Sequence, residues 1–188
     1  TLKASSCGAG PYNLTTVSQN ILSASTYTMP YFMAYVINSY IQAEEISLSY
    51  GDIFNAPYNG NTYISSLFNG ENTSDYINSK LSTSITTLFT RDFIDNYATG
   101  EKYATLRSAL VRNSVDAWKT TTPTIVFHGM GDKLVTPSVT TKIYQEFLAA
   151  GTPAGLITLV PAPGLDHQDA VLPWGVTSLK WILDIRGN

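Results

Sequence analysis

Two short segments in the second half of the chain carry residue types that can move a proton. One is 128–132 (HGMGD), which ends at Asp132, and the other is 164–167 (GLDH), which ends at His167. A carboxylate that accepts the Nδ1 proton of an imidazole fixes the tautomer of that imidazole and stabilises its protonated form. The pattern therefore predicts that Asp132 and His167 are the acid and the base of a Ser, His, Asp triad.

Three further side chains compete for these two roles. Asp166 and Asp169 are near His167 in the chain, but neighbours in sequence seldom reach Nδ1 of an imidazole in the right geometry. His128 falls at the end of an apolar run. It is interpreted as a structural histidine that is hydrogen-bonded within the acid loop, rather than as the base.

The segments that must position this pair alternate between strand and helix patterns, which is typical of βαβ units on a parallel sheet. An apolar run rich in β-branched residues predicts a buried strand just before the acid loop. Loops at the carboxyl ends of such strands carry functional groups. The predicted elements, in chain order, are strand 2–7, strand 124–127, helix 138–150, strand 156–160 with its stop at Pro161 and Pro163, and helix 173–185.

The segment 12–119 is predicted to be helical. Helical patterns at 31–45, 77–88 and 103–115 are separated by turns rich in Gly, Asn and Pro, and the sequence predicts no strand among them. A crossover between parallel strands needs only about a dozen residues. This segment is therefore interpreted as a cap or lid inserted into a single α/β unit that comprises residues 1–188.

The nucleophile of the predicted triad is hard to place in this sequence. The segment 4–8 (ASSCG) resembles the strand-to-helix turn that presents a nucleophilic serine, with Ser6 at the critical position. Such a turn needs a helix directly after the serine, whereas Gly10 and Pro11 break one here. Ser6 is therefore not expected to be the nucleophile, and Cys7 is expected to be a buried structural residue.

Composition excludes several classes of function. The net charge is −3 over 188 residues, so a phosphate backbone is not an expected partner. A single cysteine allows no internal disulfide and weakens any metal site, and no metal or other cofactor is expected. The longest apolar stretch, 29–41, is too short to span a bilayer, which takes about 20 residues. Charged residues make up only 13%, which favours a secreted or cell-envelope protein.

Together these segments resemble the C-terminal half of an α/β-hydrolase. The segments 123–137 (PTIVFHGMGDKLVTP) and 164–167 occur in the order that is found in this superfamily. More narrowly, 7–14 (CGAGPYNL) and 106–113 (LRSALVRN) resemble bacterial serine esterases of the secretory-lipase type. The resemblance implies about three parallel strands with flanking helices, a helical lid, a small-molecule carboxylic ester as substrate, Asp132 as triad acid and His167 as triad base.

The resemblance also implies what has no counterpart in this sequence. The Gly-x-Ser-x-Gly turn, the oxyanion-hole loop and about five leading strands of the family are expected before Thr1. The chain is therefore expected to be a fragment that is inactive by itself. Its first strand is expected to expose an unpaired edge, so that the chain associates with its missing N-terminal half or with itself.

The sequence allows alternatives for the role of the aromatic residues of the insertion and for the function. The aromatic residues of the insertion either line an acyl or aryl pocket or pack its own core; they are Tyr27, Tyr31, Phe32, Tyr35, Phe54 and Tyr58. The function has two alternatives to the esterase. One is a serine peptidase similar to prolyl oligopeptidase, and the other is a non-catalytic binding domain on a hydrolase scaffold.

Overall fold

The computed structural model describes residues 2–187, and the chain divides into two compact units. One unit joins the residues that precede Leu14 to those that follow Asn113, and the other is Leu14–Asn113. The first unit contains the sheet and both predicted site residues. The second is helical, and its predicted role as a lid stays a prediction.

The first unit is built on three parallel strands in the order β1-β2-β3. They are β1 (Ser5–Gly8), β2 (Thr124–Gly129) and β3 (Ile157–Ala162). Cys7 of β1 lies opposite Val126 of β2, which in turn lies opposite Leu159 of β3. Every residue of β2 is buried, as expected for an apolar central strand. The predicted α/β class with about three parallel strands is confirmed.

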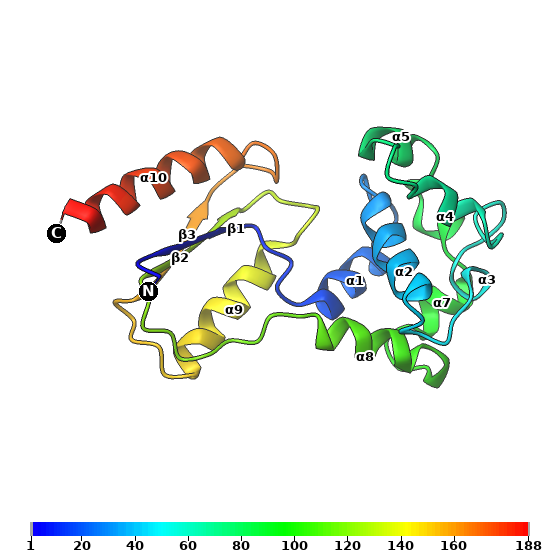
Figure 1. Ribbon diagram of the computed structural model, residues 1–188, viewed down its shortest axis with the longest axis horizontal. Helices are drawn as coiled ribbons and strands as arrows, with labels where there is room; N and C mark the ends of the chain where they lie inside the picture. The colour runs from blue at the N-terminus through cyan, green and yellow to red at the C-terminus, as the bar shows by residue number, and fades with distance from the viewer. Residues whose placement is uncertain (1, 188) are drawn as a thin grey trace. The chain divides into compact units, whose positions relative to one another are not determined.

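One helix covers each face of this sheet (Figure 1): α9 (Pro137–Ala149) on one side and α10 (Val171–Gly187) on the other. Pro137 is at the start of α9, where its missing N–H costs no helical hydrogen bond. On the α9 face, Ile143 and Phe147 pack against Ile157 of β3. On the α10 face, Trp174 packs against the cluster of Phe127, Ala162 and Ala170.

Several predicted boundaries in this unit are wrong. Strand β1 begins at Ser5 rather than at residue 2, and α10 begins two residues before the predicted start at 173. Strand β3 continues through Pro161, which was expected to stop it. The carbonyl of Leu156 accepts from the N–H of Thr124 in β2, and the carbonyl of Ala162 accepts from the N–H of Met130 just after β2. Backbone groups alternate in direction along a strand, so those of residues 157, 159 and 161 point away from β2. The nitrogen of Pro161 therefore faces the outer edge, where proline is tolerated.

The second unit is helical, as predicted. It contains two isolated antiparallel bridges, Thr26 with Ser84 and Phe54 with Phe89, and no sheet strand among its described residues. Its helices are α1 (Leu14–Ser23), α2 (Tyr31–Gln42), α3 (Tyr50–Ile53), α4 (Tyr63–Leu67), α5 (Ser74–Ser79), α6 (Ile85–Leu88), α7 (Arg91–Asn96), the 3₁₀ helix η1 (Glu101–Tyr103) and α8 (Ala104–Arg112).

The predicted helix over 77–88 is wrong, because the structure has two short helices, α5 and α6, in its place. The backbone between them pairs instead: the N–H of Tyr27 donates to the carbonyl of Thr83, and the N–H of Ile85 donates to that of Ser25. The hydroxyl of Ser82 accepts from the N–H of Ser84. Serine hydroxyls compete for backbone groups in this way, and they favour a turn over a helix interior.

The core of the helical unit is aromatic. Phe54, Phe89, Phe93, Tyr97 and Tyr103 are almost completely buried and form a continuous chain of ring contacts. The centroids of Phe93 and Tyr103 are 5.1 Å apart. Rings in tilted arrangements at this separation add a favourable contact to the burial of their area. The unit therefore has a core of its own.

Candidate active site

Asp132 lies in the loop that follows β2, and its carboxylate is held by the backbone of that same loop. The side chain is 0% exposed. Its Oδ1 atom accepts hydrogen bonds from the N–H groups of Leu134 and Val135, at 2.8 and 2.9 Å. Because these donors belong to the next three residues, the local turn itself orients the carboxylate. Its second oxygen, Oδ2, is left to face other elements.

His167 lies in the loop between β3 and α10, and it meets Asp132 directly. Its Nδ1 atom is 2.6 Å from Oδ2 of Asp132. A carboxylate can only accept, so Nδ1 carries the proton and Nε2 of the neutral ring keeps a lone pair. The imidazole is 32% exposed, whereas its carboxylate partner is fully buried. The structure thus brings together the two residues that the sequence predicted to act as a pair.

The two loops are in close contact, and glycine makes that contact possible. A Cβ atom at Gly129 would lie 2.6 Å from the carbonyl oxygen of Leu165 and 2.7 Å from that of Asp166. The N–H of Gly131 donates to the Leu165 carbonyl at 2.8 Å. Gly164 has φ +76, a left-handed conformation that glycine adopts without strain. The glycines of both motifs therefore set the distance between Asp132 and His167.

Burial and hydrogen bonding oppose each other at Asp132. Desolvation by burial raises the pKa of its carboxyl, because the charged form loses water. Hydrogen bonds from His128, the Val135 N–H, His167 and the Leu134 N–H outweigh that effect, and the pKa is lowered overall. Asp132 is therefore ionised at neutral pH and can stabilise a protonated His167.

The three competing residues do not take the place of either partner in the contact between Asp132 and His167. Asp166 accepts the N–H groups of Gln168 and Asp169 at 2.9 and 2.8 Å, so its carboxylate closes a local turn. The side chain of Asp169 is exposed. His128 is 1% exposed and is hydrogen-bonded by both ring nitrogens within the β2, loop and α9 region. It therefore has the structural position that its place in the sequence indicated.

Ser6 faces α10. Its hydroxyl is 2.6 Å from that of Ser178 and accepts the indole N–H of Trp174 at 3.0 Å. These bonds tie β1 to α10 and engage the hydroxyl in a structural role. Cys7 is half-buried rather than buried as expected, with its sulfur 3.7 Å from the hydroxyl of Ser5.

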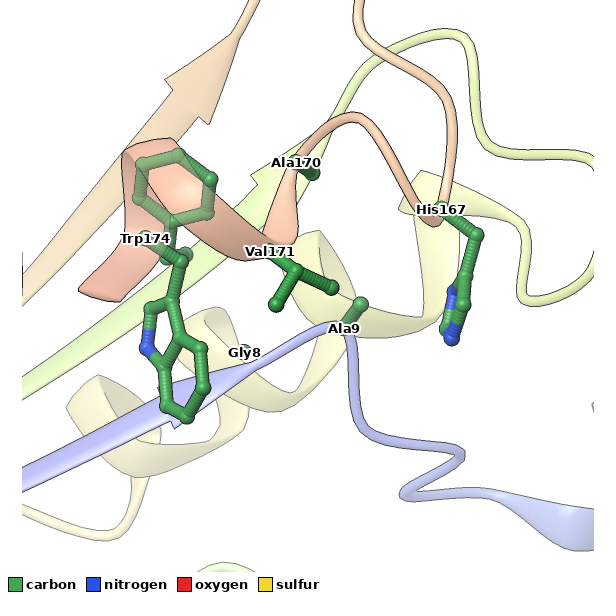
Figure 2. A pocket seen from close by; sticks show the side chains of 7 residues that line it. Gly8, Ala9, His167, Ala170, Val171 and Trp174 are labelled. Atoms are coloured by element: carbon green, nitrogen blue, oxygen red, sulfur yellow. The ribbon is translucent and has the colours of Figure 1, made fainter.

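A small hollow lies beside His167 (Figure 2), between the end of β1 and the start of α10. Figure 2 shows the imidazole of His167 and the side chains of Val171 and Trp174 around Gly8 and Ala9. Its lining is apolar apart from the imidazole, and it is formed by Gly8, Ala9, Phe127, His167, Ala170, Val171 and Trp174. A group that enters this hollow from the edge of β1 would approach the base.

The aromatic residues of the helical unit do not form one lining surface. Tyr27 and Phe54 belong to its buried core, at 7% and 0% exposure, while Phe32 and Tyr35 are 40% and 55% exposed. Tyr31 and Tyr58 are half-buried. Of the two interpretations left open by the sequence, core packing describes Tyr27 and Phe54, whereas the other four rings are half-buried or exposed.

The remaining parts of the site were not visible in the sequence. Thr140 of α9 is fully buried against His128, and Trp174 lies against Gly8. In the sequence, Thr140 is a threonine on the apolar face of a predicted helix, and Trp174 is a tryptophan near the start of another. Neither residue type in itself points to a contact with a particular partner.

The comparisons with known proteins agree with this fold. The chain is similar to a Legionella pneumophila protein that is provisionally classed as a hydrolase, with a TM-score of 0.82 and 19% identity over 98% of this chain and 48% of that one. It is also similar to the rice cell wall degrading esterase LipA of Xanthomonas oryzae, with a TM-score of 0.71 and 22% identity over 100% and 50%. For Candida antarctica lipase A in its closed state, the TM-score is 0.51 and the identity 15%, over 87% and 37%.

No protein-family model and no curated protein sequence matches the chain. The structural likeness shows that the chain shares its fold with half or less of each of these hydrolase, esterase and lipase structures. The chain spans about half the length of the Legionella and Xanthomonas structures that it matches. Among residues 2–187, no helix is both long and apolar enough to cross a membrane.

Proposed function

We propose that this chain supplies the acid and the base of a serine hydrolase that acts on carboxylic esters. The observation that carries the proposal is the 2.6 Å contact between Nδ1 of His167 and Oδ2 of a fully buried Asp132. This arrangement leaves Nε2 of a partly exposed imidazole as a proton acceptor. The esterase and lipase structures of similar fold favour an ester over other acyl substrates.

In the proposed reaction, His167 moves one proton twice. Nε2 accepts the hydroxyl proton of a serine as its oxygen attacks the ester carbonyl, and Asp132 stabilises the imidazolium that forms. The imidazolium then gives the proton to the alkoxy leaving group, which departs as an alcohol and leaves an acyl-serine. Water repeats both steps, so the carboxylic acid leaves and the serine is restored.

We propose that the serine belongs to polypeptide outside these residues, because the Ser6 hydroxyl is held by Ser178 and Trp174. Among the described residues, β1 pairs with β2 alone. Ser5 and Ala9 donate toward β2, so the backbone groups of Ser6 and Gly8 face the open edge. A further strand that pairs there would end beside the hollow next to His167, where a nucleophile is needed. The helical unit is proposed to be the lid of the intact hydrolase.

Hydrolysis of a short-chain nitrophenyl ester tests the proposal. The 188-residue chain by itself should be inactive, and a longer polypeptide that includes a Gly-x-Ser-x-Gly segment upstream should be active. In the active protein, Asp132→Asn should lower kcat by about 10⁴-fold, and His167→Asn should lower it by about 10⁶-fold. Asp169→Asn is the matched control, since this carboxylate is exposed, and it should keep the activity.

Two outcomes would overturn this proposal. Turnover by the chain alone that is abolished by Ser6→Ala would place the nucleophile on β1. An upstream segment without a serine in the turn, together with an inactive full-length protein, would instead favour a binding domain on a hydrolase scaffold.

A further inference from the structure

His128 is buried, and both of its ring nitrogens have partners. Nδ1 lies 2.5 Å from the hydroxyl oxygen of Thr140 on α9, and Nε2 lies 2.8 Å from the carbonyl oxygen of Val135. A carbonyl oxygen only accepts, so Nε2 carries the proton of the neutral ring. Nδ1 is then an acceptor, and the Thr140 hydroxyl donates to it. The surroundings therefore determine the tautomer of His128.

The protonated nitrogen of His128 also faces the predicted triad acid. Nε2 of His128 is 3.2 Å from Oδ2 of Asp132, the same oxygen that lies 2.6 Å from Nδ1 of His167. Thr140, His128 and Asp132 are all buried, at 0%, 1% and 4% exposure. These side chains form a continuous row from α9 to the exposed edge of the imidazole of His167.

We propose that His128 and Thr140 are positioning residues for the Asp132 and His167 pair. The hydroxyl of Thr140 donates to Nδ1 and holds the imidazole of His128 in place, and the Nε2–H of His128 orients the Asp132 carboxylate toward His167. This inference rests on the proposed function, because it assigns a role to Asp132 as the triad acid. It gives His128 a role beyond joining β2 to α9.

The charge balance at Asp132 supports this role. Burial raises the pKa of the carboxyl, and the hydrogen bond from His128 is the largest of the effects that lower it again. The titratable groups in contact with the carboxylate, among the residues that the structure describes, are His128 from β2 and His167 from the loop after β3. Loss of the His128 donor should therefore make the carboxylate easier to protonate.

Two substitutions of His128 separate its donor from its bulk. The amide nitrogen of His128→Gln can take the position of Nε2, whereas the amide of His128→Asn reaches only the position of Nδ1 and leaves Oδ2 without this donor. The readouts are the ¹³C titration of the Asp132 carboxyl and the ¹H signal of Nδ1–H of His167. The sequence holds two histidines, so the imidazole spectrum is simple to assign.

We expect the Asp132 midpoint in His128→Asn to rise by about one pH unit, because a hydrogen bond to a charged group is worth at least that much. As the pH is lowered, the ¹H signal of Nδ1–H of His167 should then disappear at a higher pH than it does in the unmodified chain. His128→Gln should keep both values close to those of the unmodified chain. A midpoint that His128→Asn leaves unchanged in a folded chain would overturn the proposal.

Thr140 provides a second test if His128→Asn does not fold. Thr140→Val removes the hydroxyl at constant shape and should raise the Asp132 midpoint, whereas Thr140→Ser keeps the hydroxyl and should restore it. An unchanged midpoint in Thr140→Val would also overturn the proposal. These measurements involve neither the nucleophilic serine nor an ester. They can therefore contradict the role of His128 and Thr140 while esterase activity is present, and they can support that role while esterase activity is absent.

Discussion

At the scale of single residues, the carboxylate of Asp132 is the centre of the site. Four donors surround its two oxygens: the N–H groups of Leu134 and Val135 at Oδ1, and the imidazoles of His128 and His167 at Oδ2. A buried charge is tolerated when its hydrogen-bonding capacity is satisfied in this way. The local turn orients Asp132, and the two imidazoles connect it to the rest of the first unit.

Asp132→Asn should destabilise the chain by about 1–3 kcal/mol at neutral pH, because an amide cannot accept from all four donors. Equilibrium unfolding in urea measures the change. Asp169→Asn removes one exposed carboxylate and serves as the control, with an expected change within about 0.5 kcal/mol. Equal stability of Asp132→Asn and the unmodified chain would contradict the role given to these hydrogen bonds.

The same carboxylate should make stability depend on acid pH. The pKa of Asp132 in the folded chain is below its ordinary value of 3.8, so folding favours the ionised form. The contribution of this ionised carboxylate to stability is therefore complete above pH 3.8, and it is lost as the pH falls through the lower pKa of Asp132 in the folded chain. In a series of unfolding curves, the difference in the free energy of unfolding between the unmodified chain and Asp132→Asn should become smaller as the pH falls over that interval. A difference that is constant with pH would show that the pKa is not lowered.

At the scale of elements, the site depends on how closely two loops approach. The loop after β2 and the loop after β3 meet at Gly129, where a Cβ atom would lie 2.6 Å from a backbone carbonyl oxygen. The atoms that such a Cβ would meet are the carbonyl oxygens of Leu165 and Asp166 and the Cβ atom of Ala170, none of which is the end of a flexible side chain. The distance between acid and base is thus determined by a residue that takes no part in the chemistry.

Gly129→Ala should separate the two loops and destabilise the chain by about 1–3 kcal/mol through overpacking. The Nδ1–H signal of His167 should weaken or shift, because the acid and the base move apart. Gly155→Ala is the matched control, since nothing lies within 4 Å of its added Cβ atom. Unchanged stability and an unchanged His167 signal in Gly129→Ala would contradict the close approach.

In the helical unit, one side chain satisfies the end of a short helix. The amide nitrogen of Asn55 lies within hydrogen-bond distance of the carbonyls of Thr86, Thr87 and Phe89, the last at 2.6 Å. Helix α6 has only four residues and so leaves its final carbonyls without helical partners.

Asn55→Ala should lower the stability of the helical unit by about 1–2 kcal/mol, through the loss of donors to these carbonyls. Amide hydrogen exchange should accelerate in α6 before it does so in the sheet. Asn59→Ala, at an exposed position, is the control and should change neither quantity. Uniform acceleration across both units would contradict this local role.

At the scale of the whole molecule, each compact unit has its own core, but the unit with the sheet also exposes apolar surface. Leu172, Val176, Leu179 and Leu183 of α10 are 75%, 60%, 62% and 53% exposed. Their spacing places them along one face of the helix. From an exposed apolar stripe of this length we predict a surface that another polypeptide covers.

The isolated chain should therefore self-associate as its concentration rises. Val176→Glu combined with Leu179→Lys keeps the net charge and should shift the weight-average mass toward the 20.5 kDa of a single chain in analytical ultracentrifugation. Val111→Lys, on an exposed position of α8, is the control and should leave association unchanged. An unmodified chain that is monomeric at every concentration would contradict this expectation.

The pairing of Asp132 with His167 and the three parallel strands could be predicted from the sequence. Both follow from local signals, namely apolar β-branched runs, glycine-rich ends of strands, and residue types whose chemistry is limited. The catalytic role of the pair stays a proposal. The element boundaries at 77–88 and at Pro161 were wrong, because pairing with distant backbone overrides local propensity.

Which polar groups share a partner became apparent from the packing of the folded chain. The sequence indicated that His128 bonds within the acid loop, but its contact with Thr140 joins a strand to a helix, and no spacing in the sequence encodes that contact. The same is true of Ser6, whose bonds to Ser178 and Trp174 depend on the packing of α10 on β1. Such contacts depend on how helices and strands pack together, whereas residue types and their periodicity are properties of the sequence alone.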